Sequence, residues 1–448
     1  MKGGLGWQRD HRRLGGRRRR RSPVGIFTIV VLLAVCLLVP LALIWAPHWI
    51  VSGNHPDAAK IKLQDDVRSI GLQAIGGGLL LIGAFFTART LRISAEGHLT
   101  DRFSSAVEKL DRPGSVSIGG ILALERIAQD SRRDHPAITE LLAAHVRGLI
   151  PLNNTPRTPS VETQTALSVL GRRDPRSDHA RMPTIDLSGV AMEGARLSRG
   201  QFARTDFSRS QLPRCQFRKT QLHRTRFSAS NLADADFSDA SLSQADFTGA
   251  TLSGARFINA DCRDARFVGS SLLGVVATSA KLARSEFVDA EMIGALLTDA
   301  DLSDARLDRA DLRTAFADRA VFDRAGLAAV RAAKSNLVAS RFVGANLNSI
   351  ELTSAVIAHA SFRKASMLSA KLVESVAVGT DFSEAVLCGA DLTGADLRGA
   401  TLRGADLRDA CLDHAILADA DLSGAWLSGV SMREADVIRM NITGVHWH

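Results

Sequence analysis

The sequence has little of what most globular cores and disulfide frameworks are built from. Its 448 residues contain no tyrosine, only 5% of them are aromatic, and the five cysteines are scattered without a C-x-x-C pair. Disulfide domains and zinc sites need cysteines at short, paired spacings, so neither framework is expected. The cysteines instead indicate buried thiols in a reducing compartment.

Motifs for catalysis and cofactor binding are also missing. The twelve histidines form no H-E-x-x-H, and there is no P-loop, no dinucleotide-binding glycine motif and no nucleophile elbow. Glu125, Arg126 and the Asp134-His135 pair lie on short amphipathic segments, where interspersed charges ordinarily form a solvated face. Acid–base catalysis needs a pocket that such helices rarely supply. We therefore expect no enzyme activity, no catalytic residue, no metal site and no cofactor.

The net charge of +9 is concentrated in a basic tail, residues 1–23. The first 24 residues hold nine basic side chains and one acidic side chain, a net +8, which leaves +1 for the rest of the chain. Such a tail is typical of a topology signal that keeps the N-terminus in the cytoplasm. The alternative is that these arginines bind anionic lipid or nucleic acid.

Two uncharged stretches, 24–46 and 69–88, follow the tail. A helix of either length spans a hydrocarbon core of roughly 30 Å, so residues 24–88 predict a transmembrane hairpin. A cleaved signal peptide is the alternative for the first stretch, but the stretch is too long and no A-x-A-like site follows it cleanly. Arg89 and Arg92 after the second stretch, with the arginines before the first, predict a multi-pass cell-membrane protein with both termini cytoplasmic.

The next segment, 89–150, has apolar residues at mostly helical spacing and predicts a small α-helical juxtamembrane region. Residues 151–184 are rich in Pro, Thr, Arg and Asn, which favours a linker. Within it, Val161 to Arg172 is expected to form a short helix that caps the open start of the following domain.

From residue 185 to residue 448 the sequence has a period of five, with no insertion or deletion. Every fifth residue from Leu187 to Trp447 belongs to one register, and 48 of these 53 central positions are Leu, Phe, Ile, Met, Val or Trp. Two residues before each centre, 50 of 52 positions hold Ala, Gly, Ser, Thr, Cys or Val. Neither a helix nor a strand has a period of five, so this stripe is buried only if the chain winds into stacked coils, as in a solenoid.

The repeated A-D/N-L-x-x pattern, almost undiluted in CGADLTGADLRGATLRGADLRDACLDHA (388–415), is identified as the pentapeptide repeat. The resemblance implies a right-handed quadrilateral β-helix in which each unit of five is one side of a square and four units make a coil. With the preceding segment GHLTDRFSSAVEKL, the repeats resemble actinobacterial membrane-anchored pentapeptide-repeat proteins with two N-terminal transmembrane helices. The fold expected is this solenoid, preceded by the transmembrane hairpin and the small helical region.

Phenylalanine positions support a four-sided coil independently of the resemblance. They recur at intervals of twenty residues, as stacked rings on one face would. The three series are Phe207, Phe227, Phe247, Phe267 and Phe287; Phe217, Phe237 and Phe257; and Phe322, Phe342, Phe362 and Phe382. Four central positions are alanines instead, and we interpret them as drift in a redundant array: Ala277, Ala317, Ala332 and Ala377.

Two parts of the repeat domain are candidate contact surfaces. A basic cluster in the first coils is a candidate contact for anionic lipid or for a partner, the alternative being a face that only keeps the rod soluble. Its members are Arg196, Arg199, Arg204, Arg209, Arg214, Arg218, Lys219, Arg224 and Arg226. The last coil is unusually apolar and predicts a homodimer joined end to end. Its candidate residues are Trp426, Ile438, Met440, Ile442 and Trp447.

The sequence therefore predicts a membrane-anchored, non-enzymatic interaction or scaffold module on the cytoplasmic face, with a protein partner of unknown identity. The alternative, which the resemblance implies, is a regulator that binds a DNA-processing enzyme such as a topoisomerase by DNA mimicry. Mimicry needs an acidic rod, whereas residues 185–448 hold 30 basic and 32 acidic side chains. Nucleic acid is not expected as a partner, because elements that stack on bases or enter a groove are missing.

Overall fold

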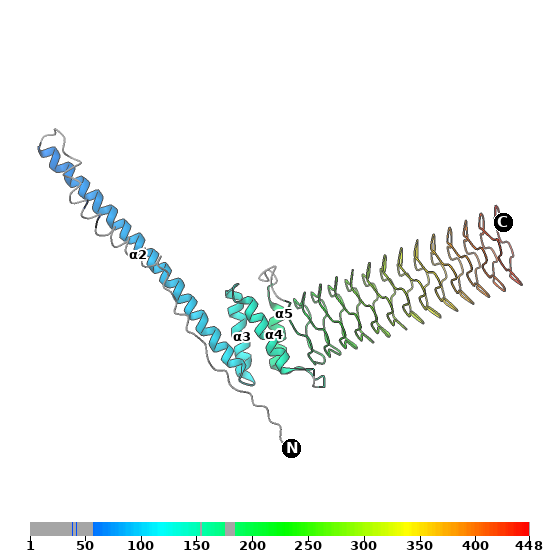
Figure 1. Cartoon of the computed structure of the whole chain (residues 1–448), viewed down its shortest axis with the longest axis horizontal. Coiled ribbons are helices and arrows are strands. Elements are labelled where there is room, and N and C mark those ends of the chain that lie inside the picture. The colour runs from blue at the N-terminus through cyan, green and yellow to red at the C-terminus, as the bar shows by residue number, and fades with distance from the viewer. Residues whose placement is uncertain (1–37, 39–41, 43–56, 153–154, 175–183, 448) are drawn as a thin grey trace, which may run out of the picture. The chain divides into compact units, whose positions relative to one another are not determined.

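The computed structural model describes residues 57–152, 155–174 and 184–447, together with residues 38 and 42. The chain divides into two compact units, Met1–His98 and Leu99–His448, and each is described by itself. Within residues 57–447, the described helices are α2 (Asp57–Leu110), α3 (Ser115–Asp130), α4 (His135–Leu149) and α5 (Val161–Arg172). The remainder of the second unit is a β-helix (Figure 1).

The predicted membrane localisation is wrong. Among the described residues, no helix is long and apolar enough to cross a membrane. The stretch 69–88 lies inside α2, a single helix of 54 residues. It is uncharged, and Gln73 and five glycines interrupt its apolar residues. The other predicted span, 24–46, lies outside the described residues except for Leu38 and Ala42.

The helices α3, α4 and α5 pack around a small apolar core that includes Leu124, Leu142 and Leu167, each at most 1% exposed. The helix α3 follows Gly114, whose φ of +80° favours glycine. The helix α5 begins at the N-cap Ser160, whose hydroxyl accepts a hydrogen bond from the Thr163 N–H at 3.1 Å. We call these three helices, with the loops between them, the cap.

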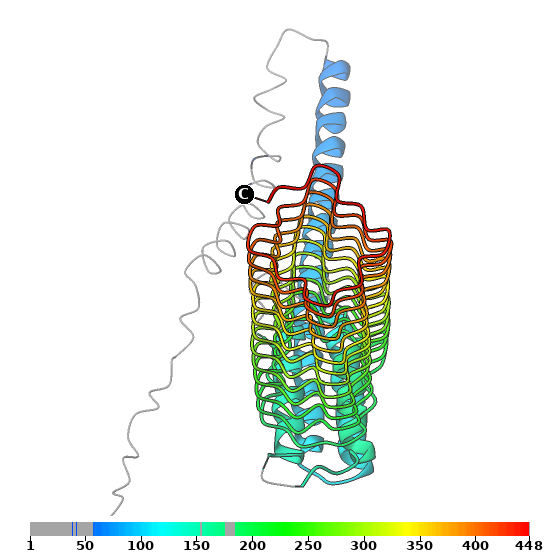
Figure 2. The ribbon, with the colours of Figure 1, turned by 90° about the vertical axis from the view of Figure 1, so that its right-hand side faces the viewer.

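The β-helix has four sides per coil, and each coil takes twenty residues. Parallel bridges join residue n to residue n + 20 at every fifth position, from Asp186↔Asp206 to Trp426↔His446. Figure 2 shows the coils of the rod one behind another, each with nearly the same outline and slightly displaced from the next. The central residue of each side and the small residue two before it point inward and are buried, up to Leu427. The four-sided β-helix that the resemblance implies, and that the spacing of the phenylalanines supports, is therefore confirmed.

Phenylalanines fill the first half of the rod's core in two facing stacks. Phe217, Phe237 and Phe257 stack in parallel with centroids 4.8 and 4.9 Å apart, which is the spacing of bridged strands. Phe227 and Phe247, from the opposite side, meet Phe237 edge-on at 5.6 and 5.7 Å. Each ring thus combines offset stacking along the rod with T-shaped contact across it, the two geometries that aromatic pairs prefer.

Each corner of the square is a residue in the left-handed region. All corners from Gly189 to Gly444 have positive φ, and most of them are not glycine. The conformation is held by the layer above, because the corner N–H donates to a carbonyl of the next coil, as Arg199 N–H does to Arg218 at 2.9 Å. A corner side chain is therefore directed outward, and its neighbours are the corners twenty residues before and after it.

The cap closes the first coil. On three of its sides the coil forms hydrogen bonds to the cap, either to the backbone of the cap or to the side-chain amide of Gln164. The backbone bonds are Ala191 N–H to Ile150 C=O (2.9 Å), Glu193 N–H to Arg157 C=O (2.9 Å) and Gln201 N–H to Gly171 C=O (2.8 Å). On the side between them, the Gln164 amide accepts from Arg196 N–H (3.0 Å) and donates to Arg196 C=O (2.7 Å). The first strand edges are thereby protected from pairing with another chain.

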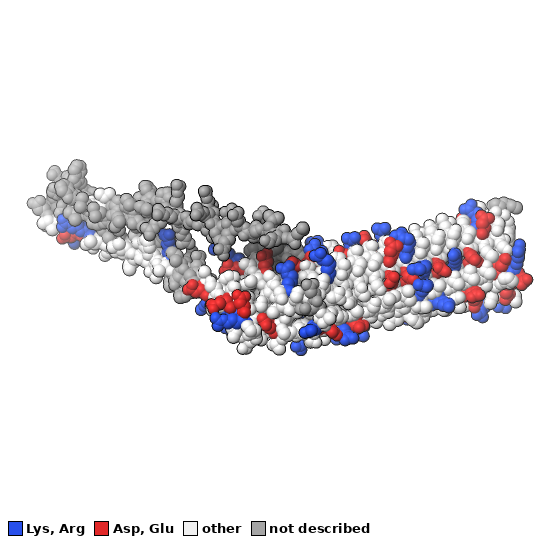
Figure 3. Space-filling view, turned by 60° about the horizontal axis from the view of Figure 1, so that its bottom comes forward, with Lys and Arg blue, Asp and Glu red and all other residues white. Residues whose placement is uncertain are grey.

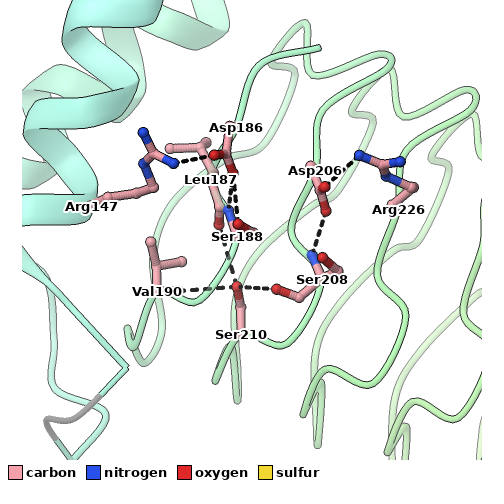
Figure 4. A network of polar contacts seen from close by, with 9 residues as sticks. All are labelled: Arg147, Asp186, Leu187, Ser188, Val190, Asp206, Ser208, Ser210 and Arg226. Carbon is pink, nitrogen blue, oxygen red and sulfur yellow. Dashed lines mark hydrogen bonds and ion pairs between the residues drawn. The ribbon is translucent and has the colours of Figure 1, made fainter.

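The fourth side is bound through side chains (Figure 4). Arg147 of α4 forms an ion pair with Asp186, whose other oxygen accepts from the Ser188 N–H at 3.0 Å and hydroxyl at 2.7 Å. One coil later Asp206 has the same arrangement, but its cation is Arg226 at 2.5 Å. The cap thus uses an ion pair that the rod itself repeats.

Candidate partner-binding surfaces

The basic cluster of the first coils forms a ring, which we call the basic collar. Six of its nine residues occupy consecutive corners of the coil, with φ between 56° and 61°: Arg199, Arg204, Arg209, Arg214, Lys219 and Arg224. Four consecutive corners surround the rod once, so the first four point in four different directions. Lys219 and Arg224 then lie over Arg199 and Arg204. The sequence predicted that these residues lie at one end of the rod, but it did not predict that they encircle the rod.

Some collar residues are neutralised. Arg226 pairs with Asp206, and Arg214 pairs with Glu193 at 2.6 Å. Burial alone would raise the pKa of Asp206, but hydrogen bonds from Ser208 and the charge of Arg226 bring it below its usual value. Arg218 also reaches a carboxylate, Asp239, at 3.4 Å.

Six collar residues have no ion-pair partner in the part of the chain that the structure describes: Arg196, Arg199, Arg204, Arg209, Lys219 and Arg224. Of these, Arg224 donates instead to the side-chain amide of Gln244 at 2.8 Å. The positive potential near them is visible in His223, whose pKa is lowered by burial and then by Arg224 and Arg204. The two arginine charges beside His223 agree with an excess of positive charge in these coils. This arrangement can hold an anionic group of a partner.

Further along the rod, corner arginines are paired with the corner aspartate one coil earlier. Arg309 binds Asp289 through two nitrogens, each at 2.7 Å, and Arg319 binds Asp299 at 2.7 and 2.9 Å. The hydrogen bond from the arginine lowers the pKa of Asp289. On the face that Figure 3 draws, blue and red atoms accordingly alternate along the later coils. The excess positive charge is therefore a property of the first coils only.

At the other end, the last described coil exposes apolar side chains. Trp426, Ile438, Ile442 and Trp447 are all exposed, Ile438 to 59%. Trp426 stacks on His446, with ring centroids 4.3 Å apart. Met440 is only partly buried and packs against the core. The candidate dimer-end residues thus lie together on the last coil.

A pocket of about 300 Å³ lies between α3, α4 and α5, and the sequence did not indicate it. Glu125 and His135, weighed above as acid–base residues, both line it. The Glu125 carboxylate is bound by Arg172 at 2.9 and 3.0 Å, which holds it in an ion pair instead of leaving it as a base. Among the described residues, no group of His, Cys, Asp or Glu could hold a metal ion.

Comparison with known proteins matches the repeat region. The family model "Pentapeptide repeat region" matches residues 190–261, and "Pentapeptide repeats" matches 260–299, 278–313, 380–419 and 415–445. The matches begin at residue 190, so the likeness of the preceding segment to actinobacterial membrane-anchored proteins is not tested by them. No curated protein sequence matches the chain.

Solved structures of repeat proteins are similar to this chain. HetL, a pentapeptide repeat protein involved in heterocyst differentiation regulation from the cyanobacterium Nostoc sp. strain PCC 7120, is 30% identical over 52% of this chain and 89% of its own, with a TM-score of 0.20. Rfr23 from the cyanobacterium Cyanothece 51142 is 33% identical over 22% of this chain and 64% of its own (TM-score 0.15). QnrB1, a plasmid-mediated fluoroquinolone resistance protein, is 17% identical over 44% of this chain and 89% of its own (TM-score 0.18).

Proposed function

The chain belongs to the pentapeptide-repeat family, and from that premise we propose that it is a non-enzymatic interaction module that binds an acidic protein surface through the basic collar. The observation that carries this proposal is the local failure of charge pairing. Arg209 and Arg309 stand on the same corner, five coils apart, yet only Arg309 has a carboxylate beneath it. Unpaired arginines on a rigid rod favour a partner of opposite charge.

The packed interior supports a binding role over a catalytic one. Central side chains such as Leu392, Leu397 and Leu402 are fully buried, so the coils enclose no ligand cavity of useful size there. Two inward thiols are shielded as well: burial raises the pKa of Cys215 to about 12, which keeps it protonated and unreactive. Chemistry is therefore left to the outer surface of the coils and to the cap.

The alternative of DNA mimicry is less favoured. A mimic presents rows of unneutralised acids, whereas many aspartates of the corner columns, including Asp289 and Asp299, are bound by arginines. Inhibition of a topoisomerase by the purified protein would support mimicry over the collar proposal.

Site-specific crosslinking in the native cell tests the proposal. A photo-crosslinking amino acid replaces Arg209 in one strain and Arg309 in a matched control strain. We expect the first variant alone to capture a protein with an acidic surface, and we expect Arg199→Glu with Arg204→Glu to abolish the capture. The same products from position 309, or capture that survives the charge reversals, would contradict the proposal.

The last coil supports a second contact, an end-to-end homodimer. The N–H groups of Met432, Val437 and Ile442 have no backbone partner among the described residues, and the exposed apolar side chains surround them. Sedimentation equilibrium of the full chain checks this. Ile438→Asp is expected to weaken a dimer of the native chain, and an unchanged association constant in this variant would refute the contact.

A further inference from the structure

One outer face of the rod carries an apolar ladder. Its rungs are the residues just before six successive centres of that face, and each is bridged to the next: Val276, Leu296, Phe316, Asn336, Val356 and Val376. Phe316 is 48% exposed, Val376 39% and Leu296 37%. Five of the six rungs are apolar, although they point away from the core.

The other three faces have no such ladder over the same coils. Their equivalent positions are mostly charged or polar: Glu286, Arg306, Gly326, Asn346 and Ser366 on one face, Glu291, Asp311, Arg331, Glu351 and Lys371 on the next, and Lys281, Asp301, Val321, Arg341 and Ser361 on the third. The apolar surface is therefore confined to one side of the square.

Inside the rod, the central residues of the same face are smaller than those of the other faces. Three of its centres are alanines that are 4% exposed or less: Ala277, Ala317 and Ala377. Each alanine directly follows a large apolar rung, in the pairs 276–277, 316–317 and 376–377. Random drift of the core predicts neither the shared face nor the apolar neighbour. On this face, large apolar side chains therefore point outward next to three positions where the inward residue is only an alanine.

The spacing of the rungs identifies what fits this face. Bridged coils repeat every ~4.8 Å, so the six rungs extend over about 24 Å. A helix laid along the ladder repeats every 5.4 Å and leaves register by about 3 Å over that length. A second copy of the rod has the same repeat and keeps its rungs between or opposite those of the first along the whole ladder.

From this match we propose that the apolar ladder binds the apolar ladder of a second copy, with the two rods antiparallel. A two-fold axis in the plane of contact, across the rods, places like columns opposite each other. With the axis between Phe316 and Asn336, Val276 lies opposite Val376 of the partner copy, Leu296 lies opposite Val356, and Phe316 lies opposite Asn336. A parallel pair would instead set the ladder against the column one residue after the centres, which holds Thr298 and Asp318.

Charge and area agree with a reversible pair. Among the outward residues of the two columns from Val276 to Val378, only Asp318 is charged, and Arg319 binds it at 3.0 Å. No like charges therefore meet when the face pairs with itself. A contact of 24 Å by about 10 Å covers a few hundred Å² on each copy, less than the ~800 Å² per partner of stable interfaces. The dimer is accordingly weak and concentration-dependent.

Pyrene labelling of single cysteines tests the geometry in the full chain with Cys36, Cys388 and Cys411 replaced by Ser. Cys215 and Cys262 stay in place because both are fully buried. Labels on Asn336→Cys lie one rung apart across the axis, so excimer emission should grow with protein concentration. Labels on Val276→Cys lie about five rungs, or ~24 Å, apart and should give none. Equal emission from both positions, or none from Asn336→Cys, overturns the antiparallel pair.

Sedimentation equilibrium then tests the surface, in an Ile438→Asp background in which the end-to-end contact is expected to be weakened. Phe316→Asp is expected to lower the association constant at least tenfold. Leu368→Asp is the matched control, since Leu368 is 40% exposed on a different face. An unchanged constant in Phe316→Asp, or an equal loss in Leu368→Asp, overturns the proposal. A change in the end-to-end contact would not produce this result, because Phe316→Asp and Leu368→Asp are compared in the same Ile438→Asp background.

Discussion

Replacing Phe237 by alanine tests how the core holds the coils together. The ring stacks on Phe217 at 4.8 Å and on Phe257 at 4.9 Å, and it meets Phe227 and Phe247 edge-on at 5.6 and 5.7 Å. Truncation of a buried phenylalanine costs ~3–5 kcal/mol through lost burial and the cavity left behind. Four ring contacts, each worth ~0.5–1.5 kcal/mol beyond burial, place this variant at the upper end, near 5 kcal/mol.

Two other phenylalanines serve as controls for that variant. Phe287 ends its series and has one ring neighbour, Phe267, at 4.7 Å, so Phe287→Ala should cost ~3–4 kcal/mol. Phe316 points outward, so Phe316→Ala in the dissociated chain should cost ~1 kcal/mol or less. Hydrogen exchange of peptides from the affected coils measures the opening free energy locally, which suits a repeat array. The reasoning is refuted if Phe316→Ala is as costly as Phe237→Ala.

Three further predictions concern the cap, the corners and pH. Gln164→Ala leaves the backbone N–H and C=O of Arg196 in the first coil without their partner in the cap. The opening free energy of that coil should fall by ~1–2 kcal/mol, so its amide hydrogens should exchange faster. Unchanged exchange would show that the cap bond is unimportant. Thr314 is a β-branched residue at a corner with φ 55°, so Thr314→Gly should relieve backbone strain and stabilise the chain by ~1 kcal/mol. Thr298 does not lie at a corner, so Thr298→Gly should not stabilise the chain. Chemical denaturation compares the stabilities of the two variants. His223 should titrate in NMR with a midpoint below pH 6.5, since burial and then the charge of Arg224 lower its pKa. Folding therefore favours the neutral imidazole. The contribution of His223 to stability is full above pH 6.5 and is lost as the pH falls through the pKa of the folded state. A midpoint at or above 6.5 would contradict this.

The sequence was most informative where one side chain type repeats. The interval of five, and the phenylalanines twenty apart, predicted square coils because burial in a narrow core constrains every central residue in the same way. Rings such as Phe207 and Phe227 indeed stack, at 5.3 Å. Phe316 was outside those series, and its outward position went unused, because a single residue that breaks a pattern carries no periodicity of its own.

Features that depend on contacts between distant segments were not predictable. Gln164 imitates a backbone group of the first coil, but its sequence neighbours do not distinguish it from any surface glutamine. The ring formed by the basic collar depends on which residue of each unit turns the corner, and arginine has no intrinsic preference for positive φ. The membrane prediction rested on the length and lack of charge of 69–88, and the structure contradicts it, because no helix among the described residues is long and apolar enough to cross a membrane.

Distances between spin labels on one corner column test the central claim, that twenty residues make one square coil, most directly. Cysteines replace Asp304 and Glu384, four coils apart, in one variant, and Asp264 and Gly424, eight coils apart, in another, in the background without Cys36, Cys388 and Cys411. At ~4.8 Å per coil, the stacked coils require about 19 Å for the first pair and about 38 Å for the second. Distances that do not double, or that exceed these values by tens of ångströms, would contradict the square coil and every surface derived from it.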